Sequence, residues 1–117
     1  MTTRGNVVKE KSYRFALDII RLVKEMPRNT ACYALGKQII RSGTSIGANI
    51  EEAIGASSKK VFTYKMNVAK KEARETLYWL GLIADSQLTN NSNTKKLTDS
   101  ANELIRILTA IVKTSER

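Results

Sequence analysis

The sequence predicts an all-α protein, specifically an antiparallel up-down-up-down four-helix bundle. Only one of its 117 residues is proline and six are glycine, so long stretches contain no residue that interrupts a helix. Apolar residues recur at spacings of three and four in four segments that are joined by short connections. The hydrophobic fraction of 42% is sufficient for a core, and the length is that of a single domain. Together these features are typical of a four-helix bundle.

The first helix is expected over residues 8–26. Pro27 ends it, because proline lacks a backbone N–H and disfavours helical geometry at the residue before it. Ala16, Ile20 and Val23 are expected to widen its apolar stripe. The stripe itself is formed by Val8, Phe15, Ile19, Leu22 and Met26.

The second helix is expected over residues 30–54, capped by Asn29 or Thr30 and closed by Gly55. Its middle is rich in small residues, and a glycine weakens an isolated helix by up to ~1 kcal/mol. A helix that keeps such residues gains a close approach to a neighbour. Its main apolar stripe is Leu35, Ile39, Ile46 and Ile50, and its small residues are Gly36, Gly43, Gly47, Ala48 and Ala53.

The third helix is expected over residues 58–86, beginning at Ser57 or Ser58, and the fourth over residues 94–114. The asparagine-rich stretch 88–93 between them predicts a loop, with Thr94 as the next cap. The first few residues and the tail after Lys113 are expected to be frayed.

The net charge of the chain indicates the class of partner. Twenty Lys and Arg against eleven Asp and Glu give a formal net charge of +9, which attracts RNA, DNA or an anionic membrane. The alternative is that the charge only maintains solubility. A membrane-surface role is the weakest option, because the core already uses the apolar stripes. The single Cys32 and the absence of a run of ~20 apolar residues predict a cytoplasmic protein without disulfides or membrane spans.

Catalytic chemistry has little support in the sequence. Histidine is absent, and neither a Cys-x-x-Cys pair nor a G-x-x-x-x-G-K-[ST] loop occurs. Glu51 and Glu52 are adjacent, so their side chains diverge by ~100° around a helix and cannot face each other as an acid–base pair. We therefore expect no enzyme activity, no cofactor, no metal and no small-molecule substrate.

A polar stripe on the second helix is the first candidate site. Gln38, Arg41 or Ser42, Ser45, Asn49 and Glu52 recur at spacings of three and four and share one face. A solvated face is one interpretation, and a packed interface between helices or between subunits is the other. The candidate interface residues are Gly43, Ser45, Gly47, Asn49 and Glu52.

A basic face on the third helix is the second candidate site. Lys60, Lys71 and Arg74 align with Asn67, Lys70 lies beside them, and Lys59 and Lys65 lie near the same end. Such a row could follow a phosphate backbone, with stacking surfaces from Tyr64, Tyr78 and Trp79. Alternatively it is an ordinary exposed face, in which Glu72 and Glu75 pair locally with the cations. The candidate nucleic-acid ligands are Lys60, Lys70, Lys71 and Arg74, with Arg14 and Arg41 as secondary candidates.

The segment from Arg41 to Ala53, R-S-G-T-S-I-G-A-N-I-E-E-A, resembles the R-S-x-x-S-I-x-A-N-I-x-E-G signature of a known family. That family is named after the protein encoded in intervening sequences of bacterial 23S ribosomal RNA genes. Other similarities extend over residues 14–85. They are Arg14-Phe15-Ala16, the Met26-Pro27 break, Leu35-x-x-Gln38-Ile39 and Ser58-Lys59-Lys60-x-Phe62. Ala53 departs from the family's usual glycine.

The resemblance implies a cytoplasmic bacterial four-helix bundle that often forms a ring-like pentamer and has no established catalytic activity. A related branch comprises accessory proteins of diversity-generating retroelements, which bind a reverse transcriptase and nucleic acid. We therefore expect a non-enzymatic homopentamer that binds RNA or DNA through its positive surface. The alternative is a protein-interaction adaptor, such as an accessory subunit of a retroelement reverse transcriptase.

Overall fold

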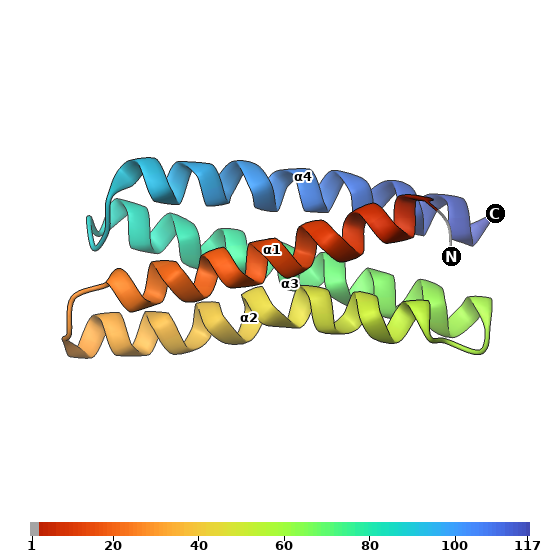
Figure 1. Ribbon diagram of the computed structural model, residues 1–117, viewed down its shortest axis with the longest axis horizontal. Helices are drawn as coiled ribbons and strands as arrows, with labels where there is room; N and C mark the ends of the chain where they lie inside the picture. The colour runs from red at the N-terminus through yellow and green to blue at the C-terminus, as the bar shows by residue number, and fades with distance from the viewer. Residues whose placement is uncertain (1–2) are drawn as a thin grey trace.

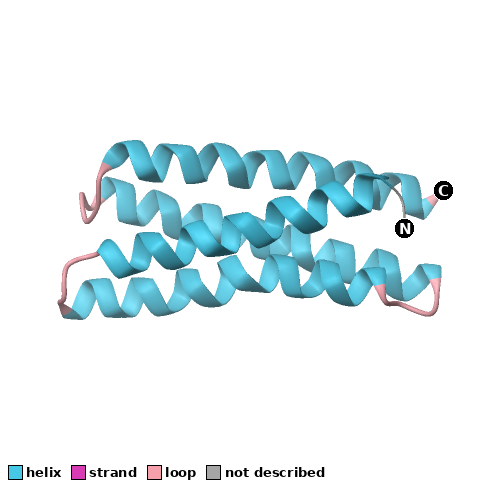
Figure 2. Ribbon diagram, in the orientation of Figure 1, coloured by secondary structure: helices cyan, strands magenta, loops and turns pink. Residues whose placement is uncertain are grey.

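The computed structural model describes residues 3–117, with side chains described from residue 5 onward. Its elements are α1 (Thr3–Glu25), α2 (Thr30–Ile54), α3 (Lys59–Asp85) and α4 (Asn91–Glu116). Figure 2 shows the four helices and the short loops that join them, and the described residues include no strand. The predicted all-α four-helix bundle is confirmed.

The four helices run antiparallel to their neighbours in a bundle that measures 45 × 21 × 18 Å (Figure 1). Contacts join α1 to α2, α2 to α3, α3 to α4, and α1 to α4. In the described part of the chain, the backbones of the diagonal pairs make no close contact, so each helix has two neighbours and one outer face. A residue's position around its helix therefore decides whether it meets the core, a neighbour or solvent.

The core forms along the predicted stripes of all four helices. Its largest fully buried side chains include Ile19, Ile39, Ile46, Met66 and Leu80. One expectation about the first stripe is wrong. Ile20 was expected to widen the buried surface of α1, but it is exposed, because α1 packs against α2 and α4 on the sides away from Ile20.

The predicted helix boundaries between α1 and α3 are close to those observed. Helix α1 ends at Glu25, before Pro27, and the Asn29 side chain accepts a hydrogen bond from the Cys32 backbone N–H at 2.9 Å. Ser58 caps α3 by accepting from the backbone N–H of Val61. Gly55 closes α2 as predicted, with a φ of −83° that does not require glycine.

The outer helix ends extend further than predicted. Helix α1 begins at Thr3 instead of residue 8. Helix α4 begins at Asn91 instead of Thr94, because Asn90 supplies the cap by accepting from the Ser92 backbone N–H.

The tail after Lys113 was expected to be frayed, but it continues α4 to Glu116. A hydrogen bond between Thr63 and Ser115 joins this end of α4 to the start of α3. Lys59 Nζ donates to the Arg117 carbonyl at the same end. A local sequence pattern cannot predict these contacts, because they join different helices.

Among the residues that the structure describes, no helix is both long enough and apolar enough to cross a membrane.

Candidate nucleic-acid interface

The outer face of α3 carries a line of cations and aromatic rings, which we call the basic–aromatic row: Lys60, Tyr64, Lys71, Arg74 and Tyr78. Successive members are separated by four, seven, three and four residues. At 3.6 residues per turn, these spacings keep all five on one side of the helix, over a length of ~27 Å. The buried residues of α3, among them Ala69, Ala73 and Leu80, lie on the opposite side.

The members of the row are exposed. The relative accessibility of Tyr64 is 64% and that of Tyr78 is 61%. Lys60, Lys71 and Arg74 are also exposed, and no acidic group within the described part of the chain forms an ion pair with them. The row therefore presents three positive charges without an ion-pair partner and two exposed tyrosine rings to solvent.

The two glutamates in the middle of α3 do not neutralise this row. Arg41 of α2 lies 3.2 Å from the Glu72 carboxylate and also forms an ion pair with Glu75. Glu75 additionally accepts a hydrogen bond from Trp79 Nε1 at 3.1 Å. Glu72 is only 9% exposed. Both carboxylates thus face α2, which argues against local pairing with Lys71 or Arg74.

The predicted nucleic-acid ligands are distributed over three helices. Lys60, Lys71 and Arg74 lie in the row, and Lys70 is half-buried beside it. Arg41 is engaged by the two glutamates on the side of α2 that faces α3. Arg14 lies on α1, where it pairs with Glu10 at 2.7 Å, and α1 does not contact α3. The structure therefore brings together four of the six.

Trp79 does not provide the stacking surface that was predicted for it. It is half-buried against the core, and its ring meets Tyr78 edge to face at a centroid distance of 5.1 Å. Its indole N–H already donates to Glu75. The sequence of α3 alone does not reveal that position 79 is half-buried against the core.

A shallow hollow lies beside one end of the row, where the start of α3 meets the end of α4. Its volume is about 580 Å³, and it is lined by Lys59, Lys60, Thr63, Tyr64, Ser115 and Glu116. Sequence reasoning missed this feature, because two of the lining residues come from the tail that was expected to be frayed.

The small residues of α2 allow a close approach to α1 of the same chain. A Cβ atom at Gly43 would lie 3.1 Å from both Cγ atoms of Ile19, and one at Gly47 would lie 3.3 Å from Ser12 Oγ. The predicted close packing at Gly43 and Gly47 is thus a contact between α1 and α2.

The polar stripe of α2 is occupied by hydrogen bonds within the chain. Ser45 Oγ donates to the Arg41 carbonyl at 2.6 Å, and Asn49 Nδ2 donates to the Ser45 carbonyl at 2.8 Å. Glu52 pairs with Lys65 of α3 at 3.3 Å. A role for Ser45, Asn49 and Glu52 between subunits stays a prediction.

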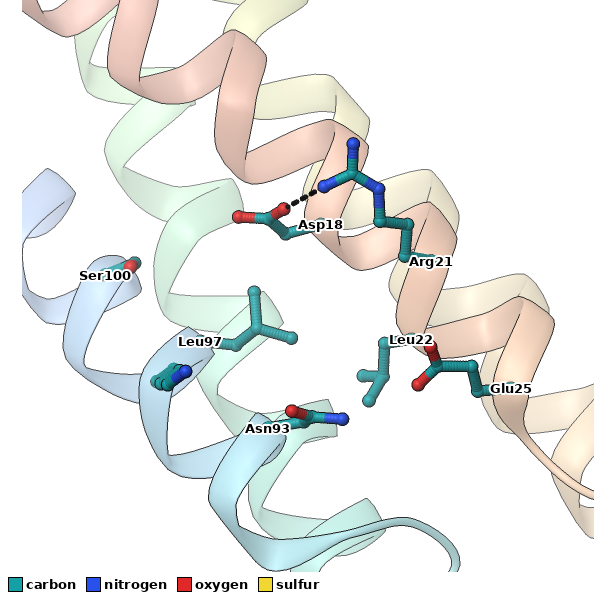
Figure 3. Close-up of a pocket in the computed structure, with 8 residues that line it drawn as sticks. Asp18, Arg21, Leu22, Glu25, Asn93, Leu97 and Ser100 are labelled. Carbon is teal, nitrogen blue, oxygen red and sulfur yellow. Dashed lines mark hydrogen bonds and ion pairs between the residues drawn. The ribbon is translucent and has the colours of Figure 1, made fainter.

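A second hollow, of about 330 Å³, lies between α1 and α4 (Figure 3). Leu22 and Leu97 lie on its walls, and Arg21 donates to Asp18 at 3.0 Å on the α1 side. Its two cations, Arg21 and Lys96, are matched by the acids Asp18 and Glu25. This balanced charge makes it a poorer phosphate site than the basic–aromatic row.

The fold and this surface define a class of protein: a small antiparallel four-helix bundle with an uncompensated cationic face on its third helix. The chain belongs to the 23S rRNA-intervening sequence protein family, whose sequence model matches residues 4–110. This match confirms the resemblance carried by the segment from Arg41 to Ala53.

A solved relative has the same architecture. It is a protein of unknown function from the S23 ribosomal protein family of Bacteroides thetaiotaomicron, 40% identical to this chain. The TM-score is 0.89, and the match covers 95% of this chain and 99% of the relative. No curated protein matches the sequence.

Proposed function

We propose that this protein is a non-enzymatic, cytoplasmic, homopentameric bundle that binds RNA or DNA through the basic–aromatic row and the adjacent Lys70. The observation that carries the proposal is the engagement of Glu72 and Glu75 by Arg41. Because both acids face α2, the outer face of α3 keeps its positive charge and attracts a polyanion.

Phosphate contacts give such a surface its affinity. Each Lys or Arg that neutralises a phosphate releases condensed counterions, which favours binding at low salt. One chain offers few contacts, so a single row binds weakly. Five chains at +9 each would give the assembly a charge of about +45, and linked weak sites gain affinity through avidity.

A pentamer requires a subunit interface, and the outer face of α1 supplies suitable chemistry. Tyr13, Leu17 and Ile20 are exposed and share one side of the helix, at spacings of four and three. Exposed apolar side chains that gather on one face are typical of protein contacts. This face lies on a different helix from the row, so assembly would leave the row accessible.

The same apolar face supports a second candidate function, that of a protein-interaction adaptor such as an accessory subunit of a retroelement reverse transcriptase. In that case the partner would cover Tyr13, Leu17 and Ile20, and the net charge would only steer association. Such an adaptor would show little affinity for naked nucleic acid.

Replacing Lys70, Lys71 and Arg74 together by glutamine tests the proposal. The matched control replaces Lys24, Arg28 and Lys37 by glutamine. This change removes the same positive charge from the region where α1 meets α2. We expect the α3 variant to lose most of its affinity for RNA and DNA and the control to lose little. The measurement is fluorescence anisotropy titration at several salt concentrations.

The salt dependence identifies the mechanism. For single strands, log K falls with log salt by ~0.7 per phosphate contact, so the α3 variant should reduce the slope by up to about two. Equal losses in the two variants would mean that net charge, and not the face of α3, governs binding. Undiminished binding by the α3 variant would contradict the site, and no binding by the wild-type protein would favour the adaptor.

A further inference from the structure

We infer that the basic–aromatic row prefers single-stranded to double-stranded nucleic acid, with Tyr64 and Tyr78 as stacking platforms for unpaired bases. This inference rests on the proposed function, since it specifies which form of nucleic acid the same face binds.

The two tyrosines have no evident role in the stability of the bundle. Their rings project from the side of α3 that is opposite the core, and more than half of each side chain is in contact with solvent. Tyr64 has no hydrogen bond, ion pair or ring contact to the described part of the chain. Tyr78 makes one ring contact in the described part of the chain, a T-shaped contact with Trp79. An aromatic face left in water is available to stack on a base.

Cations accompany each ring at a distance suited to a nucleic-acid strand. Lys60 lies one turn before Tyr64, and Arg74 lies one turn before Tyr78, an axial distance of ~6 Å in each case. Lys71 lies between the two pairs. Each ring can therefore hold a base while a neighbouring cation holds a phosphate, which is how sequence-tolerant single-strand sites combine charge with stacking.

The spacing of the tyrosines sets the length of strand that engages both. Fourteen residues of helix separate Tyr64 from Tyr78, which corresponds to ~21 Å along the axis. At a rise of ~3.4 Å per stacked nucleotide, this distance spans about six nucleotides. The shallow hollow next to Tyr64 leaves that side of the ring open to a base.

A duplex cannot use these features. Its bases are paired and stacked on each other, so it offers the row phosphates without free base faces. Unpaired bases of RNA and of DNA present the same ring faces, and the inference therefore applies to single strands of either. The two tyrosines of the row add affinity only for a strand whose bases are unpaired.

The test compares a mixed-sequence 20-nucleotide strand, as RNA and as DNA, with the same strand annealed to its complement. Wild-type protein is titrated at one salt concentration, and anisotropy reports binding. We expect each single strand to bind at least ~10-fold more tightly than the corresponding duplex. Tyr64→Ala and Tyr78→Ala should each weaken single-strand binding by at least ~5-fold and leave duplex binding unchanged.

Matched variants separate stacking from other effects. Tyr64→Phe and Tyr78→Phe keep the ring and should bind as the wild type does. Tyr33→Ala removes a tyrosine that is 65% exposed on α2, away from the row, and it should leave binding unchanged. The alanine variants should also keep the salt slope of the wild type, because no phosphate contact is removed.

Two results would overturn the inference in distinguishable ways. Equal affinity for single strand and duplex, with loss on replacing Lys70, Lys71 and Arg74, would refute strand preference and leave the proposed function intact. Absence of binding to every nucleic acid tested would refute both.

Discussion

At the scale of single residues, Arg41 pairs with two acidic side chains of the neighbouring helix α3. Its guanidinium engages Glu72 and Glu75, and Glu72 is nearly buried. A carboxylate withdrawn from water needs a cationic or hydrogen-bonding partner. The ion pairs with Arg41 therefore hold both glutamates on the α2 side of α3. One residue on α2 thus keeps acidic groups away from the outer face of α3.

Gly43 is a residue whose small size lets α1 and α2 approach closely. Alanine there would add a Cβ atom 3.1 Å from both Cγ atoms of Ile19, a fully buried β-branched residue with little freedom to move. Overpacking costs ~1–3 kcal/mol, and the better helix propensity of alanine returns up to ~1 kcal/mol. We expect Gly43→Ala to lower the free energy of unfolding by about 1 kcal/mol in urea denaturation.

Gly81 provides the control for this substitution. It lies in α3, and a Cβ atom there would have no neighbour within 4 Å. Gly81→Ala should therefore raise the free energy of unfolding by up to ~1 kcal/mol through helix propensity alone. If both variants were more stable than the wild type, the contact between Gly43 and Ile19 would not limit how closely α1 and α2 approach.

At the scale of elements, the connection from α3 to α4 contains a residue in an unfavourable backbone conformation. Gln87 has a φ of +55°, the only positive φ among non-glycine residues of the described chain. The backbone N–H of Leu88 donates to the Ile83 carbonyl, and that of Gln87 donates to the Ala84 carbonyl. This pattern is a Schellman motif, in which the residue at position 87 is usually glycine.

Gln87→Gly should stabilise the protein, because glycine adopts a left-handed conformation without the Cβ clash that other residues suffer. The greater freedom of glycine in the unfolded chain offsets part of this gain. We expect a net increase of up to ~1 kcal/mol in the free energy of unfolding, seen as a higher urea midpoint. Ser86→Gly is the control: Ser86 has a φ of −83°, so glycine there relieves no strain and should destabilise.

At the scale of the whole molecule, the basic and apolar surfaces lie on different helices. The row occupies the outer face of α3, whereas Tyr13, Leu17 and Ile20 occupy that of α1. Helices α1 and α3 are one of the two diagonal pairs, and their described backbones make no close contact. An interface formed by the outer face of α1 would therefore not cover the row of the same subunit.

Light scattering coupled to size exclusion tests this arrangement. We expect the wild-type protein to have a mass near five times the 13.1 kDa of one chain. Replacing Leu17 and Ile20 together by glutamine should shift the mass toward that of one chain, because their burial would drive association. Val61→Gln, which changes an exposed apolar residue on α3, should leave the mass unchanged.

The outcomes of this measurement separate two assumptions: that the protein is a pentamer, and that α1 forms its subunit interface. A wild-type mass of one chain would contradict the pentamer. A pentamer that persists after both substitutions on α1 would place the subunit interface elsewhere. Growth of the wild-type mass on adding a mixed-sequence RNA or the matching DNA would support nucleic-acid binding by the assembled form.

Most of the fold and part of the candidate site could be predicted from periodicity. The buried stripes and the alignment of Lys60, Lys71 and Arg74 depend only on the 3.6-residue repeat of a single helix. The roles of Trp79 and Ile20 could not be predicted in this way. Each depends on which neighbouring helix lies on which side, and the sequence of one helix does not contain that information.

The sequence by itself determined four helices, the family and the net charge of +9, because these follow from local spacing, a signature segment and composition. Only the tertiary structure decided where that charge is uncompensated. The ion pairs from Arg41 to Glu72 and Glu75 join residues more than thirty positions apart in the chain. They form because α2 packs beside α3, and this packing leaves the outer face of α3 to its cations and tyrosines.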